Sequence, residues 1–263
     1  SVANSQGTNI VLNIFTNVTV NAAMGIANQV NAAVYSFVSN FQTAFNPQLV
    51  KSYAAGEKEE FQRLVNRSAK FSFYLLWLIV LPVYVNCSFL LSLWLKNVPQ
   101  YSIGFVRLVL IFSLIEALNG PLWISIQAAG KIRAYQIIVG IINILNLPFS
   151  IAAFCLGANP YWILYIRIAL NCATFGIRIL LSKKYFALRA RPFLRDSVLI
   201  PVFIAAVSAS LTLLFGKMIS KTVLHFFATC IVSAIVSGIL IFFIGMKTNE
   251  RKAIIEKIRR GRK

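Results

Sequence analysis

Long hydrophobic runs with few charges are the feature that most limits how this chain can fold. Several stretches continue for about 20 residues, the length that an α-helix needs to cross roughly 30 Å of hydrocarbon. Because a bilayer core offers no hydrogen bonds to the backbone, only helices or closed barrels can span it. The 263 residues are 58% hydrophobic and only 13% charged, whereas a soluble domain is about a quarter charged. The sequence therefore predicts an all-α, polytopic transmembrane helical bundle.

Eight hydrophobic segments are recognisable along the chain. The first, at about 7–19, is short and polar for a span, and the second continues to about residue 50. The remaining spans are predicted at 71–95, 103–128, 134–157, 160–182, 197–216 and 223–246. Between the second and third, residues 57–70 have an amphipathic pattern that predicts a helix along the membrane surface. We therefore expect about eight spans.

The 26 lysines and arginines are concentrated in alternate connections. These are the loop at 51–70, the turn with Lys131 and Arg133, the stretch 178–195 and the tail 247–263. The positive-inside rule makes this side cytoplasmic, together with the C-terminus. A formal net charge of +19 is also found in nucleic-acid-binding proteins. Short basic clusters between hydrophobic runs are typical of membrane topology instead, so we expect no nucleic-acid partner.

Asparagines recur at a spacing of four near the beginning of the chain and continue into the second segment. They are Asn9, Asn13, Asn17, Asn21, Asn28 and Asn31. In one helix, the first four amides would form a slowly rotating stripe. Such a stripe is either a hydrated wall that hydrogen-bonds a polar solute, or a set of amides that joins neighbouring helices.

Ionisable residues inside spans are functional candidates because burying them in hydrocarbon is costly. Glu116, the only acidic residue within a predicted span, either titrates during transport or pairs with a basic residue of another helix. Arg107 and Arg167 lie near the outer ends of their spans. They either snorkel to the interface or point inward to hold an anion. Gly120 and Pro121 predict a helix break one turn after Glu116, of the kind that borders transporter sites.

Motifs of soluble catalysis are absent from the sequence. There is no glycine-rich phosphate loop and no nucleophile elbow. The four cysteines are scattered singly, without a CxxC or His-Cys cluster. We expect neither an enzyme nor a bound metal or cofactor.

Five short motifs carry a more specific indication. They are NAAMGIANQV at 21–30, SNFQTAFNPQ at 39–48, KSYAAGE at 51–57, LWLKNVP at 93–99, and Gly120-Pro121 followed by QAAGK at 127–131. Together they resemble the second half of bacterial polysaccharide flippases. These are the Wzx-type O-antigen flippases of the multidrug/oligosaccharidyl-lipid/polysaccharide (MOP) exporter superfamily. The resemblance covers about residues 1–195, and the last two spans match by hydropathy alone.

The resemblance implies a MATE-like fold, in which two six-helix lobes surround a cavity and two further helices follow. This chain would supply spans seven to fourteen, with the N-terminal lobe outside it. Residues 1–190 would form the C-terminal lobe. Residues 191–263 would form two additional helices and a basic cytoplasmic tail. The implied activity is alternating-access transport of undecaprenyl-pyrophosphate-linked oligosaccharide across the bacterial inner membrane, for surface polysaccharide and lipopolysaccharide biosynthesis.

The resemblance also implies roles for the candidate residues and partners for the protein. Arg107 and Arg167 would hold the pyrophosphate, while Glu116, Gly120 and Pro121 would couple or gate transport. Sugar hydroxyls would meet Asn9, Asn13, Asn17, Asn28 and Asn31. Partners would be the lipid-linked oligosaccharide, membrane lipids, and polysaccharide polymerase and assembly proteins.

Three other functions remain as alternatives to a flippase. A MATE-type cation-coupled drug exporter would usually have more intramembrane acids and fewer asparagines. A membrane glycosyltransferase or polymerase would need large outer loops. A non-transporting membrane scaffold is the third.

Overall fold

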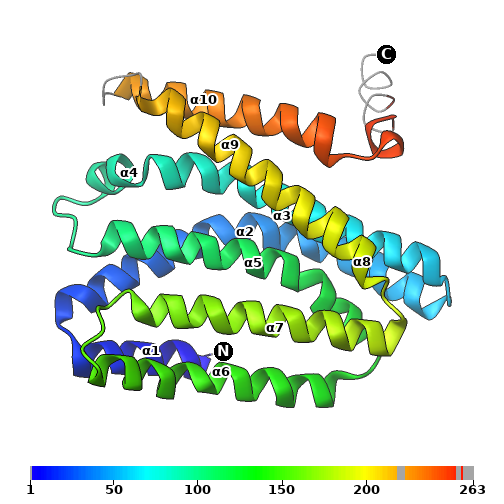
Figure 1. The fold of residues 1–263 in the computed structure, drawn as a ribbon, viewed down its shortest axis with the longest axis horizontal. Helices are drawn as coiled ribbons and strands as arrows, with labels where there is room; N and C mark the ends of the chain where they lie inside the picture. The colour runs from blue at the N-terminus through cyan, green and yellow to red at the C-terminus, as the bar shows by residue number, and fades with distance from the viewer. Residues whose placement is uncertain (1, 218–222, 253–255, 257–263) are drawn as a thin grey trace.

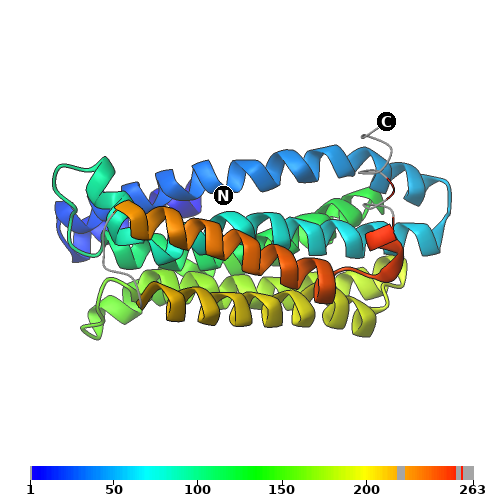
Figure 2. The ribbon, with the colours of Figure 1, turned by 90° about the horizontal axis from the view of Figure 1, so that it is seen from above.

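The computed structural model describes residues 2–217, 223–252 and 256, and these form helices without a strand (Figure 1). Seen from above, the axes of the helices are nearly parallel to one another (Figure 2). The first seven are α1 (Val2–Phe15), α2 (Val18–Ala54), α3 (Lys58–Val85), α4 (Cys87–Trp94), α5 (Ser102–Ala128), α6 (Ile132–Cys155) and α7 (Trp162–Phe186). They are followed by α8 (Ala190–Phe193), the π-helical turn η1 (Leu194–Leu199), α9 (Ile200–Lys217), α10 (Val223–Leu240) and the π-helical turn η2 (Ile241–Gly245). The predicted all-α bundle is confirmed.

Six helices in the described part of the chain are long and apolar enough to cross a membrane. They are α3, α5, α6, α7 and the continuous segments Ala190–Gly216 and Val223–Gly245. The two missing from the predicted eight are α1, which has 14 residues, and α2, which has 37. The first is too short to cross about 30 Å. The second is long enough, but it contains no stretch of span length that is apolar enough to cross a membrane.

Two predicted features of the 57–95 region are wrong. The span predicted at 71–95 begins earlier, at Lys58, and ends at Val85, where Asn86 separates α3 from α4. Residues 57–70 therefore do not lie as a separate helix along the membrane surface. They begin α3, and Phe61 and Val65 are buried in the protein core. The apolar face of this amphipathic pattern packs against other helices.

Prolines inside the long helices do not end them. α3 continues through Pro82, α5 through Pro121 and α6 through Pro148. The break predicted at Gly120 and Pro121 is therefore wrong. A proline removes one backbone donor, and a helix can continue when a neighbouring side chain satisfies the carbonyl that is left over.

α5 lies at the centre of the bundle, in contact with α2, α3 and α7 (Figure 1). α6 packs against α7 and α1. α9 and α10 pack against each other and against α3, so α3 joins the last two helices to the rest. Buried polar contacts support this junction: Trp77 Nε1 donates to Ser208 Oγ at 2.9 Å, and Asn86 Nδ2 donates to Thr229 Oγ1 at 3.0 Å.

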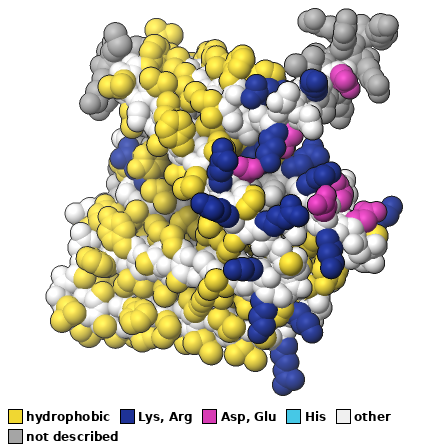
Figure 3. Space-filling model, turned by 45° about the vertical axis from the view of Figure 1, so that its right-hand side comes forward, with side chains coloured by type: hydrophobic (Ala, Val, Ile, Leu, Met, Phe, Trp, Pro, Cys, Tyr) yellow, Lys and Arg dark blue, Asp and Glu magenta, His cyan; other side chains and the backbone are white. Residues whose placement is uncertain are grey.

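The connections that follow α2, α5 and α7 lie at the same end of the bundle (Figure 1). Figure 3 shows lysine and arginine side chains gathered over this end, while hydrophobic side chains dominate the rest of the visible face. This is the alternation that the basic clusters predict for a multi-pass membrane protein. Most of the basic tail, residues 253–255 and 257–263, lies outside the described residues.

Candidate functional site

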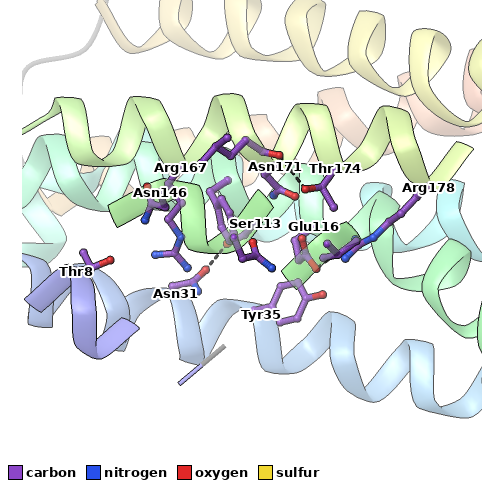
Figure 4. A pocket seen from close by; sticks show the side chains of 14 residues that line it. Thr8, Asn31, Tyr35, Ser113, Glu116, Asn146, Arg167, Asn171, Thr174 and Arg178 are labelled. Carbon is purple, nitrogen blue, oxygen red and sulfur yellow. Dashed lines mark hydrogen bonds and ion pairs between the residues drawn. The ribbon is translucent and has the colours of Figure 1, made fainter. Parts of the chain in front are cut away.

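A polar cavity of about 330 Å³ opens among five helices (Figure 4). α1, α2 and α5 contribute Thr8, Asn31, Tyr35, Phe112, Ser113 and Glu116. α6 and α7 contribute Val139, Asn143, Asn146, Arg167, Leu170, Asn171, Thr174 and Arg178. Amides, hydroxyls and guanidinium groups thus meet a single carboxylate inside a membrane bundle.

One face of α7 supplies most of the charge in the cavity. Arg167, Asn171, Thr174 and Arg178 follow one another at helical spacings of four, three and four, so they share a stripe of the helix. The Thr174 hydroxyl donates to the carbonyl of Leu170 at 2.9 Å within the same helix. α7 therefore presents one cation near each end of a polar row (Figure 4).

Glu116 is held by α7 and by its own helix. Its Oε1 lies 3.6 Å from the guanidinium nitrogen Nη1 of Arg178, and Asn119 Nδ2 donates to its Oε2 at 3.3 Å. Arg178 is 8% exposed, and its Nε donates to the Tyr135 hydroxyl at 2.6 Å. Asn119 also donates to Asn171 Oδ1 at 2.8 Å. The carboxylate is thus the counter-ion of a buried arginine. This agrees with the second of the two alternatives for Glu116, a basic partner on another helix.

Arg167 is the second cation of the cavity and has a different environment. Its guanidinium lies 4.2 Å from the centre of the Phe112 ring. Among the residues that the structure describes, no carboxylate forms an ion pair with it. An arginine over an aromatic face keeps its five donors available for an anion. Arg167 is therefore the group best placed to bind a negatively charged ligand.

Three of the predicted site residues line this cavity: Asn31, Glu116 and Arg167. Asn31 lies opposite Ser113, whose hydroxyl donates to Asn31 Oδ1 and to the carbonyl of Val109. This contact joins α2 to α5 at the cavity wall.

The asparagine stripe does not form as predicted, because the helix ends before Asn17. The Asn17 side chain caps α2 by accepting a hydrogen bond from the amide of Val20 at 3.0 Å. Asn13 and Asn21 lie on different helices and meet through a hydrogen bond of 2.9 Å from Asn21 Nδ2 to Asn13 Oδ1. The series therefore caps and joins helices near the α1–α2 turn. The cavity lining does not include Asn9, Asn13, Asn17 or Asn28.

Arg107 also lies outside the cavity lining. Its Nε donates to the carbonyl of Tyr84 at 3.3 Å, and its guanidinium lies 5.2 Å from the centre of the Tyr84 ring. It therefore joins α5 to α3. Gly120 and Pro121 likewise do not line the cavity. Gly120 lies against Gln42 of α2, which donates to the carbonyl of Ala117.

Arg178 is the main residue that sequence reasoning placed wrongly, since it was counted with the basic loop at 178–195. It lies inside α7 and is buried. The row of polar residues that begins at Arg167 and repeats at helical spacing could have identified it. Tyr35, Asn143, Asn146 and Asn171 were also missed, because a single polar residue in a span gives no sign of the face that it occupies.

Comparison with known proteins identifies a family match. The family model described as MatE matches residues 8–152, which is more than half of the chain. The match includes α2, α5 and most of α6, whereas Arg167 and Arg178 lie beyond it. No curated protein and no solved structure matches the chain.

Proposed function

Since the chain belongs to the MatE family of membrane transporters in the MOP superfamily, we propose that it is the second lobe of a lipid-linked oligosaccharide flippase. The substrate would be an undecaprenyl-pyrophosphate-linked oligosaccharide, which crosses the bacterial inner membrane for surface polysaccharide synthesis. The C-terminus would lie in the cytoplasm. Polysaccharide polymerase and assembly proteins would be the partners.

The environment of Arg167 is the observation that carries this proposal. This guanidinium has no carboxylate partner among the described residues, and it lies inside a cavity lined by amides and hydroxyls. It therefore suits a ligand that combines negative charge with many hydroxyl groups. Asn171 adds a donor to this set. Its side chain is 7% exposed, and its Nδ2 has no hydrogen-bond partner among the described residues. Binding a ligand acceptor would remove the cost of leaving this amide unpaired.

The surface of α2 supports a path for a polar substrate. Its exposed residues are small or polar over most of its length, with Phe37 as the large exception. They include Ala22, Gly25, Gln29, Ala32, Ala33, Ser36, Ser39, Asn40 and Thr43. α10 instead exposes Leu224, Phe227, Ile231, Ile235 and Ile239. The exposed surface of α10 is suited to hydrocarbon, and that of α2 is not. We infer that α2 faces a hydrated cavity between lobes, and α10 faces lipid.

A cation-coupled drug exporter is the second candidate, and Glu116 is the observation that favours it. An intramembrane carboxylate can carry a proton or bind a cation. Its ion pair with Arg178 and its contact with Asn119 oppose this role, because both oxygens of the carboxylate already have partners.

Complementation distinguishes the two functions. The full-length gene encoding this chain should restore surface glycan to a flippase-null strain. Arg167→Gln should lower surface glycan about tenfold or more, since a hydrogen bond to a charged group contributes about 1.5–3 kcal/mol. Arg107→Gln is the matched control, because Arg107 also packs on an aromatic ring but lies outside the cavity. Drug resistance without restored glycan would replace the proposal with the exporter.

A further inference from the structure

Pro121 leaves one carbonyl of α5 without its usual partner. In an α-helix the carbonyl of residue 117 accepts from the amide of residue 121, and proline has no amide hydrogen. Here Gln42 of α2 supplies the donor: its Nε2 donates to the carbonyl of Ala117 at 2.9 Å. The same nitrogen donates to Ser72 Oγ of α3 at 3.1 Å. One side chain thus joins three helices at the proline.

Gly120 is the residue that lets Gln42 come this close. A Cβ at position 120 would lie 2.2 Å from Gln42 Oε1 and 2.7 Å from its Cδ. Any larger side chain would push the Gln42 amide away from Ala117. Gly120 and Pro121 therefore act together, since the proline frees the carbonyl and the glycine makes room for the replacement donor.

This junction lies next to the candidate site. Glu116 precedes Ala117 directly, and Asn119 precedes Gly120, so two α5 residues with polar contacts to α7 flank the braced carbonyl. On α2, Gln42 lies seven residues after Tyr35, which lines the cavity. α5 changes direction over its last turns (Figure 1), as expected for a helix that contains proline.

We propose that Gln42 is a positioning residue of the cavity. Its amide replaces the missing backbone hydrogen bond at Pro121 and holds α5 in the conformation that places Glu116 and Asn119 against α7. This inference concerns the geometry of the site and does not depend on which substrate the protein carries.

A set of stability measurements tests the brace in the purified full-length protein. Gln42→Met should lower the melting temperature by about 2–4 °C, because it leaves the Ala117 carbonyl unsatisfied. In the Pro121→Ala background, where the backbone amide returns, the same substitution should have little effect. Gln48→Met is the matched control, since Gln48 is an exposed glutamine of the same helix. Equal effects of Gln42→Met in both backgrounds would overturn the brace.

Gly120→Ala gives a second test, because the melting temperature should fall if the proposal is right and rise if it is wrong. Replacing a helical glycine with alanine normally stabilises the helix. Gly176→Ala, where the added Cβ meets nothing within 4 Å, should leave the melting temperature unchanged or raise it. Gly120→Ala should lower it because it displaces Gln42. A rise at both positions would contradict the proposal.

Crosslinking separates positioning from stability alone. Asn119→Cys and Asn171→Cys place thiols on α5 and α7 where the two amides now meet at 2.8 Å, in a background with the native cysteines replaced by serine. Adding Gln42→Met should slow disulfide formation about tenfold at a temperature well below melting. Adding Gln48→Met should not. If the rate is unchanged by Gln42→Met, the residue only stabilises the fold and the proposal is wrong.

Discussion

The cavity contains two arginines whose neighbours assign them different tasks. Arg178 is buried and already has a carboxylate and a hydroxyl as partners. Arg167 packs over Phe112 and has no carboxylate partner among the described residues. A ligand anion that binds a paired arginine must first displace the arginine's partners, and this costs more free energy than binding an arginine without a carboxylate partner. Substitutions of the two arginines should therefore differ, with stability affected at Arg178 and ligand binding at Arg167.

Tyr135→Phe tests the structural task of Arg178. The substitution removes the acceptor of the 2.6 Å hydrogen bond from Arg178 Nε and leaves a buried donor unsatisfied. The free energy of unfolding should fall by about 1.5–3 kcal/mol, measured by reversible unfolding in lipid or detergent. Tyr165→Phe is the control at an exposed tyrosine, and it should change stability by less than about 0.5 kcal/mol. Equal losses would show that Tyr135 acts through packing alone.

Helix α2 differs from the other long helices in the surface that it presents. Between Val18 and Val50 its exposed face is small and polar except at Phe37, and α6, α9 and α10 expose many large aliphatic and aromatic side chains instead. The same helix directs Asn31 and Tyr35 into the cavity and Gln42 to α5. α2 therefore has two distinct polar faces. One packs against α5, and the other is exposed and unsuited to lipid.

Thiol labelling measures the environment of these faces. Cysteines that replace Ser36 and Asn40 of α2 should react with a membrane-impermeant maleimide, because water reaches this face. Cysteines that replace Ile235 and Ile239 of α10 should stay unlabelled in intact membranes, since hydrocarbon surrounds them. All four positions are exposed on the chain itself, so burial within the chain does not explain a difference. Equal labelling of both pairs would contradict the assignment of α2 to a hydrated cavity.

In the molecule as a whole, α3 holds the last two helices to the rest by polar contacts along its length. At the basic end, Lys70 is 3% exposed, and its ammonium lies 2.6 Å from Glu250 Oε2. Arg67 lies 3.8 Å from the other oxygen of the same carboxylate. Nearby, Ser197 Oγ donates to the carbonyl of Asn66 at 3.1 Å. The two contacts of Glu250 attach the segment after α10 to α3, and the contact of Ser197 attaches η1 to α3.

The two partners of the Lys70–Glu250 pair should tolerate replacement differently. Glu250→Gln leaves the buried ammonium of Lys70 without its anion and should cost about 3–5 kcal/mol. Lys70→Met should cost less, because Arg67 still faces the carboxylate, which also accepts from the amide of Lys247 at 2.8 Å. Unfolding free energies of the two variants give the comparison. A greater loss in Lys70→Met would contradict this asymmetry.

Hydropathy and charge by themselves determined the fold class, because only a helix satisfies its own backbone in hydrocarbon. They also placed the basic connections at one end, and they identified Glu116 and Arg167 as unusual residues at their depth. Several details were beyond them. The pattern of four asparagines is the same whether a helix continues or is capped at Asn17, and only neighbouring packing separates these cases.

Tertiary structure decided which polar groups meet. Arg178 becomes a site residue through Glu116, which is distant in sequence, and Gln42 becomes significant only because Pro121 of another helix leaves a carbonyl unsatisfied. Local sequence determines whether a segment is a helix and how polar it is. The partner of each polar group depends on how helices cross, and that depends on side-chain packing along the whole bundle.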